Sequence, residues 1–425
     1  MARLVMKFGG TSVADLDRIH NVARHVQREV EAGNQVAVVV SAMAGRTNEL
    51  VGWVENMPRV AGANAALYDA REYDTIVASG EQVTSGLLAI ALQSLGVDAR
   101  SWQGWQIPLK TDLAHGSARI ADIEGSKMMD RMAQGQVAVV AGFQGISPEG
   151  RIATLGRGGS DTSAVAIAAA IKADRCDIYT DVDGVYTTDP RVAPAARRLD
   201  KITFEEMLEL ASLGAKVLQV RSVELAMVHG VPTFVRSSFD DPASIDSSPG
   251  AVPVGTLICH EDEIVEQQVV TGIAYAKDEA QISLRRVADK PGVAAAVFGP
   301  LADAHVNVDM IVQNVSEDGS VTDMTFTVPD TDVEKAVKVL ESARSEIGFE
   351  AIQSDKGMVK VSVVGIGMRS HAGVASTAFQ SLADKGINIR AITTSEIKIS
   401  ILIDQDYAEL AVRTLHSVYG LDRQA

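Results

Sequence analysis

The chain has 425 residues, 46% of them hydrophobic and 22% charged, so it is long enough for two or three domains and too apolar for wholesale disorder. Its 39 Lys and Arg and 55 Asp and Glu give a net charge of −16, which excludes broad binding to nucleic acid. The only two cysteines, Cys176 and Cys259, exclude a disulfide framework and a cysteine-rich zinc module. The start lacks the apolar core of a signal peptide, and no apolar run reaches the ~18–20 residues of a membrane span. We therefore expect a cytoplasmic enzyme that binds neither nucleic acid nor membranes.

Short apolar runs alternate with helical patterns through the first half of the chain. Strands are expected at 4–8, 35–41, 136–141 and 176–180, and helices at 15–32, 80–95, 161–172 and from Thr203, where Glu206 completes a capping-box pattern. This alternation predicts an α/β domain with a largely parallel sheet. Turn formers dominate 237–250, so we set the end of this domain at residue 245, although a long surface loop inside one domain has the same composition.

The C-terminal part contains an internal repeat. Residues 289–314 and 370–395 match at an offset of 81 residues, with Gly292 and Asn307 corresponding to Gly373 and Asn388. In each copy a strand precedes a helix that starts at glycine, and two strands and a second helix follow. This order is typical of a ferredoxin-like βαββαβ module, and we expect two such modules, at 265–345 and 346–425, packed side by side.

Two glycine-rich turns each precede an expected helix and carry a cation. They are Lys7-Phe-Gly-Gly-Thr-Ser12 and Gly156-Arg-Gly-Gly-Ser-Asp161. Glycines let backbone amides approach phosphate oxygens, and the helix N-terminus adds partial positive charge. Two such turns suit a polyphosphate and an anionic co-substrate. The alternatives are a purely structural turn for the first and a helix-capping role for Asp161; beside a phosphate, Asp161 would instead hold a lysine or a metal.

The segment from Thr180 to Arg191 follows an expected strand and is rich in carboxylates. It lacks the third ligand position and the terminal Glu of a calcium loop. A nucleoside pocket fits better, in which Asp181 contacts the ribose or base, Tyr186 stacks and Arg191 reaches phosphate. The alternative is a turn, since Asp-Gly clusters usually form turns.

Three more polar residues stand at the ends of expected elements. Ser41 ends a buried strand at the sheet edge where open α/β sheets bind ligands. Glu81 begins a helix and could pair with a substrate ammonium, or serve as a first-turn helix acid. Lys216 follows a helix, where a lone lysine usually complements the helix dipole. No Ser/His/Asp triad or activated cysteine stands out.

Together these motifs resemble those of the aspartokinases, and the resemblance covers essentially the whole chain. The matching segments, in family order, are 7–12, Ser79-Gly-Glu81, 154–161, 180–191 and Gly214-Ala-Lys-Val-Leu218, and the repeat resembles the family's pair of ACT modules. The resemblance implies an amino-acid-kinase domain, with its sheet sandwiched by helices, followed by two ACT modules. The first module is inserted within the second, which would assign part of 251–266 to the second module. One departure is Gln219-Val220, where the family commonly has His-Pro.

The reaction that the resemblance implies is transfer of the γ-phosphoryl of Mg-ATP to the β-carboxylate of L-aspartate, the first step of lysine, threonine and methionine biosynthesis. The attacking group is already an anion, so catalysis reduces to positioning and charge neutralisation. Mg²⁺ would be held mainly by the phosphates, without a metal site on the protein. The implied roles are catalysis for Lys7 and Asp161, ATP binding for Lys7, Gly9, Gly10, Thr180, Asp181, Tyr186, Arg191 and Lys216, and aspartate binding for Ser41, Thr47, Glu81 and Arg157.

The paired modules imply feedback control by lysine, threonine or both, and a homo-oligomer formed through them. The implied effector positions are Asp289, Asn307, Asp309 and Gln313 in the first module and Val374, Asn388, Ile389 and Ser395 in the second. Asn307 and Asn388 could instead simply end helix–strand loops. One competing interpretation is a kinase for glutamate, acetylglutamate, carbamate or UMP, which the paired modules and the 7–12 motif disfavour. The other is a catalytically inactive amino-acid sensor, against which the retention of five residues argues: Lys7, Glu81, Arg157, Asp161 and Lys216.

Overall fold

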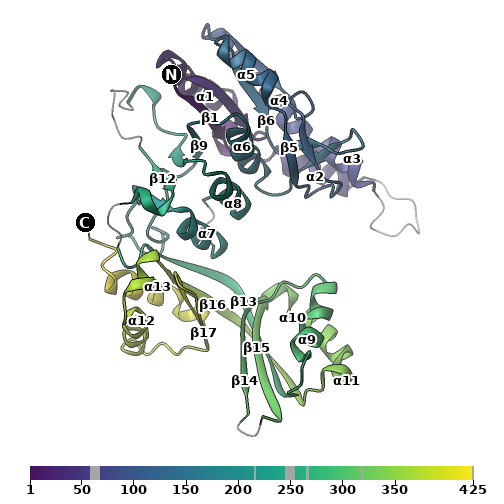
Figure 1. The fold of residues 1–425 in the computed structure, drawn as a ribbon, viewed down its shortest axis with the longest axis vertical. Coiled ribbons are helices and arrows are strands. Elements are labelled where there is room, and N and C mark those ends of the chain that lie inside the picture. Colours follow the sequence, from purple (N-terminus) through teal and green to yellow (C-terminus); the bar gives the residue numbers. More distant parts are fainter. Residues whose placement is uncertain (58–67, 215–216, 245–253, 265–267, 317–318, 424–425) are drawn as a thin grey trace. The chain divides into compact units, whose positions relative to one another are not determined.

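The computed structural model describes residues 1–57, 68–214, 217–244, 254–264, 268–316 and 319–423 (Figure 1). The chain forms two compact units. The first comprises 1–185, 198–211 and 216–265, and the second comprises 186–197, 212–215 and 266–425. Two short segments from before the predicted domain boundary at residue 245 therefore pack with the C-terminal unit.

An eight-stranded sheet forms the centre of the first unit. Its strand order is β10-β12-β11-β9-β1-β2-β6-β3. The strands are β1 (Arg3–Phe8), β2 (Gln35–Val40), β3 (Ala99–Trp102), β6 (Val137–Ala141), β9 (Arg175–Thr180), β10 (Lys201–Thr203), β11 (Thr233–Ser237) and β12 (Thr256–Cys259). Every neighbouring pair is parallel except β11 and β12. The predicted largely parallel sheet is confirmed.

Helices cover both faces of this sheet. Those that pack most extensively against its strands are α1 (Leu16–Glu31), α4 (Ser79–Ser94), α5 (Ser126–Ala133) and α6 (Gly159–Ala170). The other helices of the first unit are α2 (Arg46–Glu55), α3 (Ala70–Val77), α7 (Phe204–Ser212) and α8 (Val220–His229). Strand β1 shows the two faces, because Met6 and Phe8 join the core beneath α1 and α4, whereas Lys7 between them pairs with Asp161 of α6. The predicted capping box at the start of α7 is present, since Thr203 and Glu206 exchange hydrogen bonds between side chain and backbone.

One helical stretch, Ala70–Ser94, is long and apolar enough to cross a membrane by length and composition alone. The sequence pattern predicts a helix at 80–95 but no membrane span. In the structure 56% of its most apolar window is buried, and Leu88 and Leu92 pack in the core with α1. The stretch is therefore a core helix of the first unit.

A second, smaller sheet in the first unit has four short strands in the order β5-β4-β7-β8. These are β4 (Leu109–Thr111), β5 (Ile120–Ile123), β7 (Gln144–Ile146) and β8 (Ile152–Thr154). The sequence analysis did not predict this sheet, because strands of three or four residues are too short to show a clear hydrophobic period. Strand β8 ends at Thr154, two residues before Gly156 begins the second glycine-rich turn, and so fixes where that turn begins.

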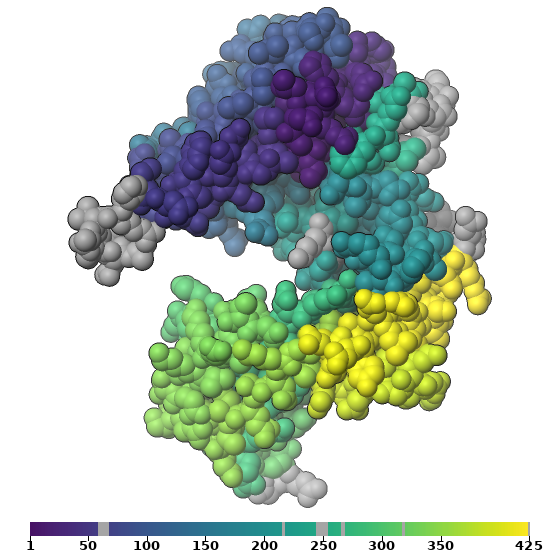
Figure 2. All heavy atoms as spheres, turned by 180° about the vertical axis from the view of Figure 1, so that it is seen from behind, coloured from purple at the N-terminus to yellow at the C-terminus, as the bar shows by residue number. Residues whose placement is uncertain are grey.

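The second unit contains the two repeated modules, which share one six-stranded sheet in the order β14-β15-β13-β16-β18-β17. The first module's elements are β13 (Gly272–Ala288), α9 (Val293–Asp303), β14 (Asp309–Val315), β15 (Val321–Pro329), α10 (Val333–Ser342) and α11 (Arg344–Ile347). Those that follow are β16 (Ala351–Val364), α12 (Val374–Ala383), β17 (Ala391–Thr394), β18 (Lys398–Asp404) and α13 (Ala408–Val418). The two modules lie side by side, green and yellow in Figure 2, as the repeat predicts.

The long strands β13 and β16 each serve both modules. Residues 279–288 of β13 pair with β15 in the first module, whereas 272–276 pair with 360–364 of β16 in the second. The chain therefore begins the second module at Gly272, forms the first module, and returns to the second module along β16. The expectation that part of 251–266 joins the second module is wrong for the described part: β12 pairs with β10 and β11 of the eight-stranded sheet, and the second module's strand begins at Gly272.

Candidate active site

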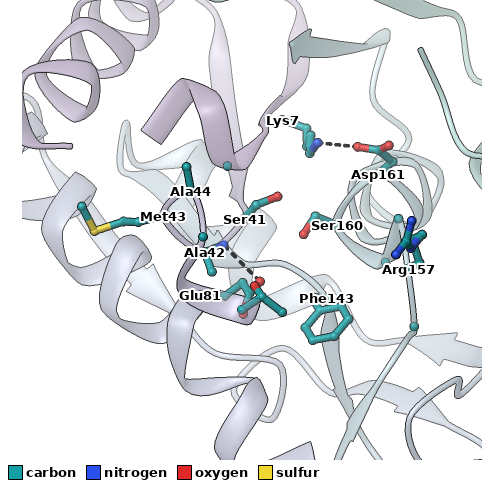
Figure 3. A pocket seen from close by; sticks show the side chains of 16 residues that line it. Lys7, Ser41, Ala42, Met43, Ala44, Glu81, Phe143, Arg157, Ser160 and Asp161 are labelled. Atoms are coloured by element: carbon teal, nitrogen blue, oxygen red, sulfur yellow. Dashed lines mark hydrogen bonds and ion pairs between the residues drawn. The ribbon is translucent and has the colours of Figure 1, made fainter. Parts of the chain in front are cut away.

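A cavity of about 290 Å³ lies at the carboxyl ends of β1 and β2, between the first turns of α4 and α6 (Figure 3). It is lined by Lys7, Gly10, Ser41, Ala42, Met43, Ala44, Gly45, Thr47, Glu81, Phe143 and residues 156–161. Because parallel strands place their carboxyl ends on one edge of a sheet, residues from distant motifs converge here. The cavity joins seven of the predicted site residues: Lys7, Gly10, Ser41, Thr47, Glu81, Arg157 and Asp161.

Lys7 and Asp161 form an ion pair on one wall of the cavity. Lys7 Nζ lies 2.5 Å from Asp161 Oδ1, and each residue is only 8% exposed. The two side chains point toward one another in Figure 3. The buried cation is neutralised by its partner, and it is held at the N-terminus of α6, where backbone amides also favour an anion. This wall can attract a phosphate group.

Glu81 lies in the first turn of α4 and is 3% exposed. Its Oε1 accepts a hydrogen bond of 3.0 Å from the Ala42 amide, and its Oε2 is buried with no hydrogen-bond partner among the described residues. Burial raises the pKa of Glu81 from 4.5 to about 7, against the lowering effect of the Ala42 hydrogen bond. A buried carboxylate with a spare oxygen in a cavity wall suits a positively charged ligand group.

Arg157 projects from the turn between β8 and α6. Its side chain is exposed, and no carboxylate among the described residues pairs with its guanidinium. Gly156 and Gly158 on either side have φ of +77° and +72°, which favours glycine at both positions. Ser41 and Thr47 line the same cavity from the end of β2 and the start of α2. The cavity thus combines a spare carboxylate oxygen, an unpaired guanidinium and two hydroxyls.

Most of the residues predicted to bind ATP do not line this cavity. Gly9 lies beside Lys7, because a Cβ there would stand 3.4 Å from Lys7 Nζ. Thr180 ends β9, the parallel neighbour of β1, and Asp181 follows it, so both lie at the same sheet edge as the end of β1. Tyr186 and Arg191 fall in segment 186–197, which packs with the second unit, and Arg191 pairs with Asp189 at 2.8 Å. Lys216 lies outside the described residues.

Among the predicted effector residues, Asn307 and Asn388 occupy matching places in the two modules. Asn307 and Asn388 are exposed and precede β14 and β17, and Gln313 and Ser395 are exposed near the ends of those strands. Asp309, Asp289, Val374 and Ile389 complete the predicted set. Asp309 forms an ion pair with the buried Lys360 of β16, and Val374 begins α12, with its carbonyl accepting from the Tyr419 hydroxyl at 2.8 Å.

Sequence reasoning missed several residues that line the cavity, chief among them Phe143, Ser160 and Met43. Ser160 belongs to the second glycine-rich turn, and Phe143 follows β6 at the ligand-binding edge of the sheet, so the position of that strand could have indicated it. Phe143 also has φ of +68°, an uncommon backbone conformation for a bulky residue, which no sequence pattern signalled.

Comparison with known proteins matches this architecture. Residues 2–237 match the amino acid kinase family, and residues 281–345 and 361–419 each match an ACT domain. The chain is 51% identical to the aspartate kinase of Pseudomonas putida, over 100% of this chain and 99% of that protein. It resembles E. coli aspartokinase III in complex with aspartate and ADP (R-state) with a TM-score of 0.78 at 28% identity, over 98% and 99% of the two chains. The same enzyme in complex with lysine and aspartate (T-state) gives a TM-score of 0.76 at 29% identity, with the same coverage.

Proposed function

Since the chain belongs to the aspartate kinase family, we propose that it transfers the γ-phosphoryl group of ATP to the β-carboxylate of L-aspartate, giving 4-phospho-L-aspartate and ADP. One observation carries this proposal. The walls of the cavity hold the cation Lys7, beside the backbone amides at the N-terminus of α6, and a buried carboxylate with a spare oxygen, Glu81. This combination suits an amino acid that meets a phosphate, because the ammonium and the anionic groups each have a partner of opposite charge.

Aspartate would bind by its three charged groups. Its ammonium would donate to Glu81 Oε2, which stabilises the ionised form of that carboxylate. Arg157 presents a planar fork suited to a carboxylate, and the hydroxyls of Ser41 and Thr47 can donate to the other carboxylate. With the ammonium and one carboxylate fixed, the second carboxylate is directed toward Lys7. Glutamate is longer by one methylene and would place its side-chain carboxylate differently.

The transfer itself needs no general base, because the attacking carboxylate oxygen is already anionic. The β-carboxylate oxygen forms a bond to the γ-phosphorus as the bond to the β,γ-bridging oxygen breaks, and ADP leaves with that electron pair. Lys7 reduces the repulsion between the two anions, and Asp161 fixes the direction of the ammonium group of Lys7. Gly9, Gly10, Thr180 and Asp181 stand at the sheet edge where the phosphates and nucleoside would lie.

ATP enters with Mg²⁺, which binds phosphate oxygens and usually only one or two carboxylates. Asp161 is the carboxylate in the cavity beside Lys7, so it is the residue of this chain placed to contact such an ion. The ion would supply charge neutralisation on the transferring phosphate.

Hydroxylamine trapping tests this proposal. An acyl phosphate reacts with hydroxylamine to give a hydroxamate, which forms a coloured complex with ferric ion. The purified chain with ATP and Mg²⁺ should therefore form hydroxamate with L-aspartate and much less with L-glutamate or with no amino acid. Equal formation from glutamate, or none from aspartate, would reject the assignment of the substrate.

The two ACT domains support control of this reaction by an end product, lysine or threonine, of the amino-acid pathway that 4-phospho-L-aspartate begins. The exposed Asn307 and Asn388 and the neighbouring strand edges are the proposed effector sites. The same assay with lysine and threonine, added singly and together, distinguishes one effector from two acting in concert. No change at millimolar concentrations of either would reject feedback by these amino acids.

We also propose that the modules form a homo-oligomer. Ile311 and Val315 on β14 and Ile392 on β17 are exposed apolar side chains on the two edge strands of the six-stranded sheet, and exposed apolar edges favour association. Light scattering of the full chain and of Ile311→Asp should give a smaller mass for the variant. Both cysteines are buried free thiols, which fits a cytoplasmic location.

A further inference from the structure

A buried carboxylate outside the cavity is aimed at the base of the Arg157 turn. Asp74, on α3, is fully buried, and its hydrogen-bond partners His115, Gly116 and Thr154 are not among the residues that line the cavity. Its Oδ1 accepts a hydrogen bond of 2.5 Å from the Thr154 hydroxyl, and its Oδ2 lies 2.7 Å from His115 Nδ1. The Gly116 amide donates to the same carboxylate at 3.1 Å. One side chain therefore joins α3, β8 and the loop before β5.

The loop at 115–118 in turn packs against the turn that carries Arg157. A Cβ on Gly156 would stand 3.3 Å from the Gly116 carbonyl oxygen, so the two backbones are in close contact. The Ala118 amide donates to the Thr154 carbonyl at 2.9 Å. Asp74 thus holds both sides of this contact, through Thr154 on one side and Gly116 on the other.

A cation on α8 also holds the residues before this turn. Arg221 donates from its two terminal nitrogens to the carbonyls of Leu155 and Ala118, at 2.8 Å each. The polar groups of Thr154 and the carbonyl of Leu155 are therefore bonded just before the turn, whereas Arg157 itself is exposed. Hydrogen bonds therefore hold the residues that lead to Arg157, and the guanidinium of Arg157 is available to bind a ligand.

We propose that Asp74 is a positioning residue: it fixes the turn that carries Arg157, and through that turn it sets the affinity for the amino-acid substrate. This inference rests on the proposed function, in which Arg157 binds a carboxylate of aspartate. Asp suits the position because a carboxylate can accept from three donors at once, whereas an apolar side chain would leave buried donors unpaired. Small displacements of a binding group cost substantial affinity.

The test uses Thr154→Val, which keeps the side-chain volume but removes the hydroxyl that Asp74 accepts. We expect the KM for aspartate to rise about tenfold, with the KM for ATP changed less than twofold. Thr154→Ser keeps the hydroxyl and should return the KM for aspartate to within about twofold of the original value. Asp74→Asn keeps only one acceptor oxygen, so its KM for aspartate should lie between those of Thr154→Val and Thr154→Ser.

The matched control is Thr203→Val, which also removes a buried hydroxyl that bonds a carboxylate, here that of Glu206, but at β10 on the edge of the eight-stranded sheet. It should lower the melting temperature without changing the KM for aspartate. An unchanged KM in Thr154→Val, or an equal rise in Thr203→Val, would overturn the inference while the proposed function stands. A parent enzyme that forms no hydroxamate from aspartate would overturn both.

Discussion

Replacing Glu81 by Gln should make the protein more stable and lower its affinity for aspartate. Burial raises the pKa of Glu81 from 4.5 to about 7 in the folded protein, so the native state prefers the protonated form. Ionisation of this buried group therefore costs stability as the pH rises from about 4.5 to 7, and the full cost is present above pH 7. The shift of about 2.5 pH units corresponds to about 3 kcal/mol at that point.

The difference should appear as a pH-dependent gap between the two proteins. At pH 5 Glu81→Gln and the parent should melt within about 2 °C of each other, and at pH 8 the variant should melt roughly 5–10 °C higher, given the size of the first unit. Aspartate should raise the melting temperature of the parent at pH 8 more than that of the variant, because its ammonium stabilises the ionised carboxylate. Differential scanning fluorimetry from pH 5 to 8.5 measures both effects.

Glu29→Gln provides a control in which the change in melting temperature should have the opposite sign. Burial alone would raise the pKa of Glu29, but the hydrogen bond from Arg28 and the charge of Arg175 outweigh it and hold this pKa below its usual value. Ionised Glu29 therefore stabilises the fold above its unfolded pKa, and its replacement should lower the melting temperature at pH 8 more than at acid pH. Parallel melting curves for Glu81→Gln and the parent across the whole range would refute the reasoning.

Three further outcomes follow from the cavity. Lys7→Ala and Asp161→Ala should each lower kcat by ~100-fold or more, and near-native turnover in either would remove its assigned role. The parent's kcat/KM for aspartate should fall about tenfold per pH unit below about pH 7, as Glu81 becomes protonated; a flat profile to pH 6 would contradict its pairing with the ammonium. Gly158→Ala should raise the KM for aspartate, because its Cβ would stand 1.9 Å from Gln219 Cγ and because φ at this position is +72°. Adding Gln219→Ala to this variant should relieve the clash with Gln219 but not the backbone strain. Unchanged kinetics in Gly158→Ala alone would contradict the close packing.

Long apolar strands and glycine-rich turns made much of the fold predictable. The runs that became β2 and β6 are almost wholly apolar, and those of β1 and β9 mainly so, because helices cover both faces of the sheet. The repeat made the paired modules predictable. The four-stranded sheet escaped notice because its strands are short. The boundary at residue 245 could not anticipate that segment 186–197 packs with the C-terminal unit, since that depends on contacts such as the Thr187 hydroxyl with His416.

The cavity residues were predictable for a different reason. Lys7, Ser41, Glu81 and Asp161 stand at the ends of strands or the starts of helices, and parallel topology brings those positions together. Asp74 gave no such signal. Its partners His115 and Thr154 are 41 and 80 residues away in sequence, and an acid within a helix usually faces solvent. Only the fold shows that it is buried beneath the Arg157 turn.

The central claim, that a side-chain carboxylate oxygen of aspartate attacks the γ-phosphorus, is tested most directly by following that oxygen. Aspartate labelled with ¹⁸O in its β-carboxylate is incubated with the enzyme, ATP and Mg²⁺, and the product is cleaved with hydroxylamine, which attacks the acyl carbon and releases phosphate with the bridging oxygen. Mass spectrometry should find one ¹⁸O in the released phosphate, and label placed in the α-carboxylate should not appear there. Unlabelled phosphate from β-labelled aspartate would contradict the account.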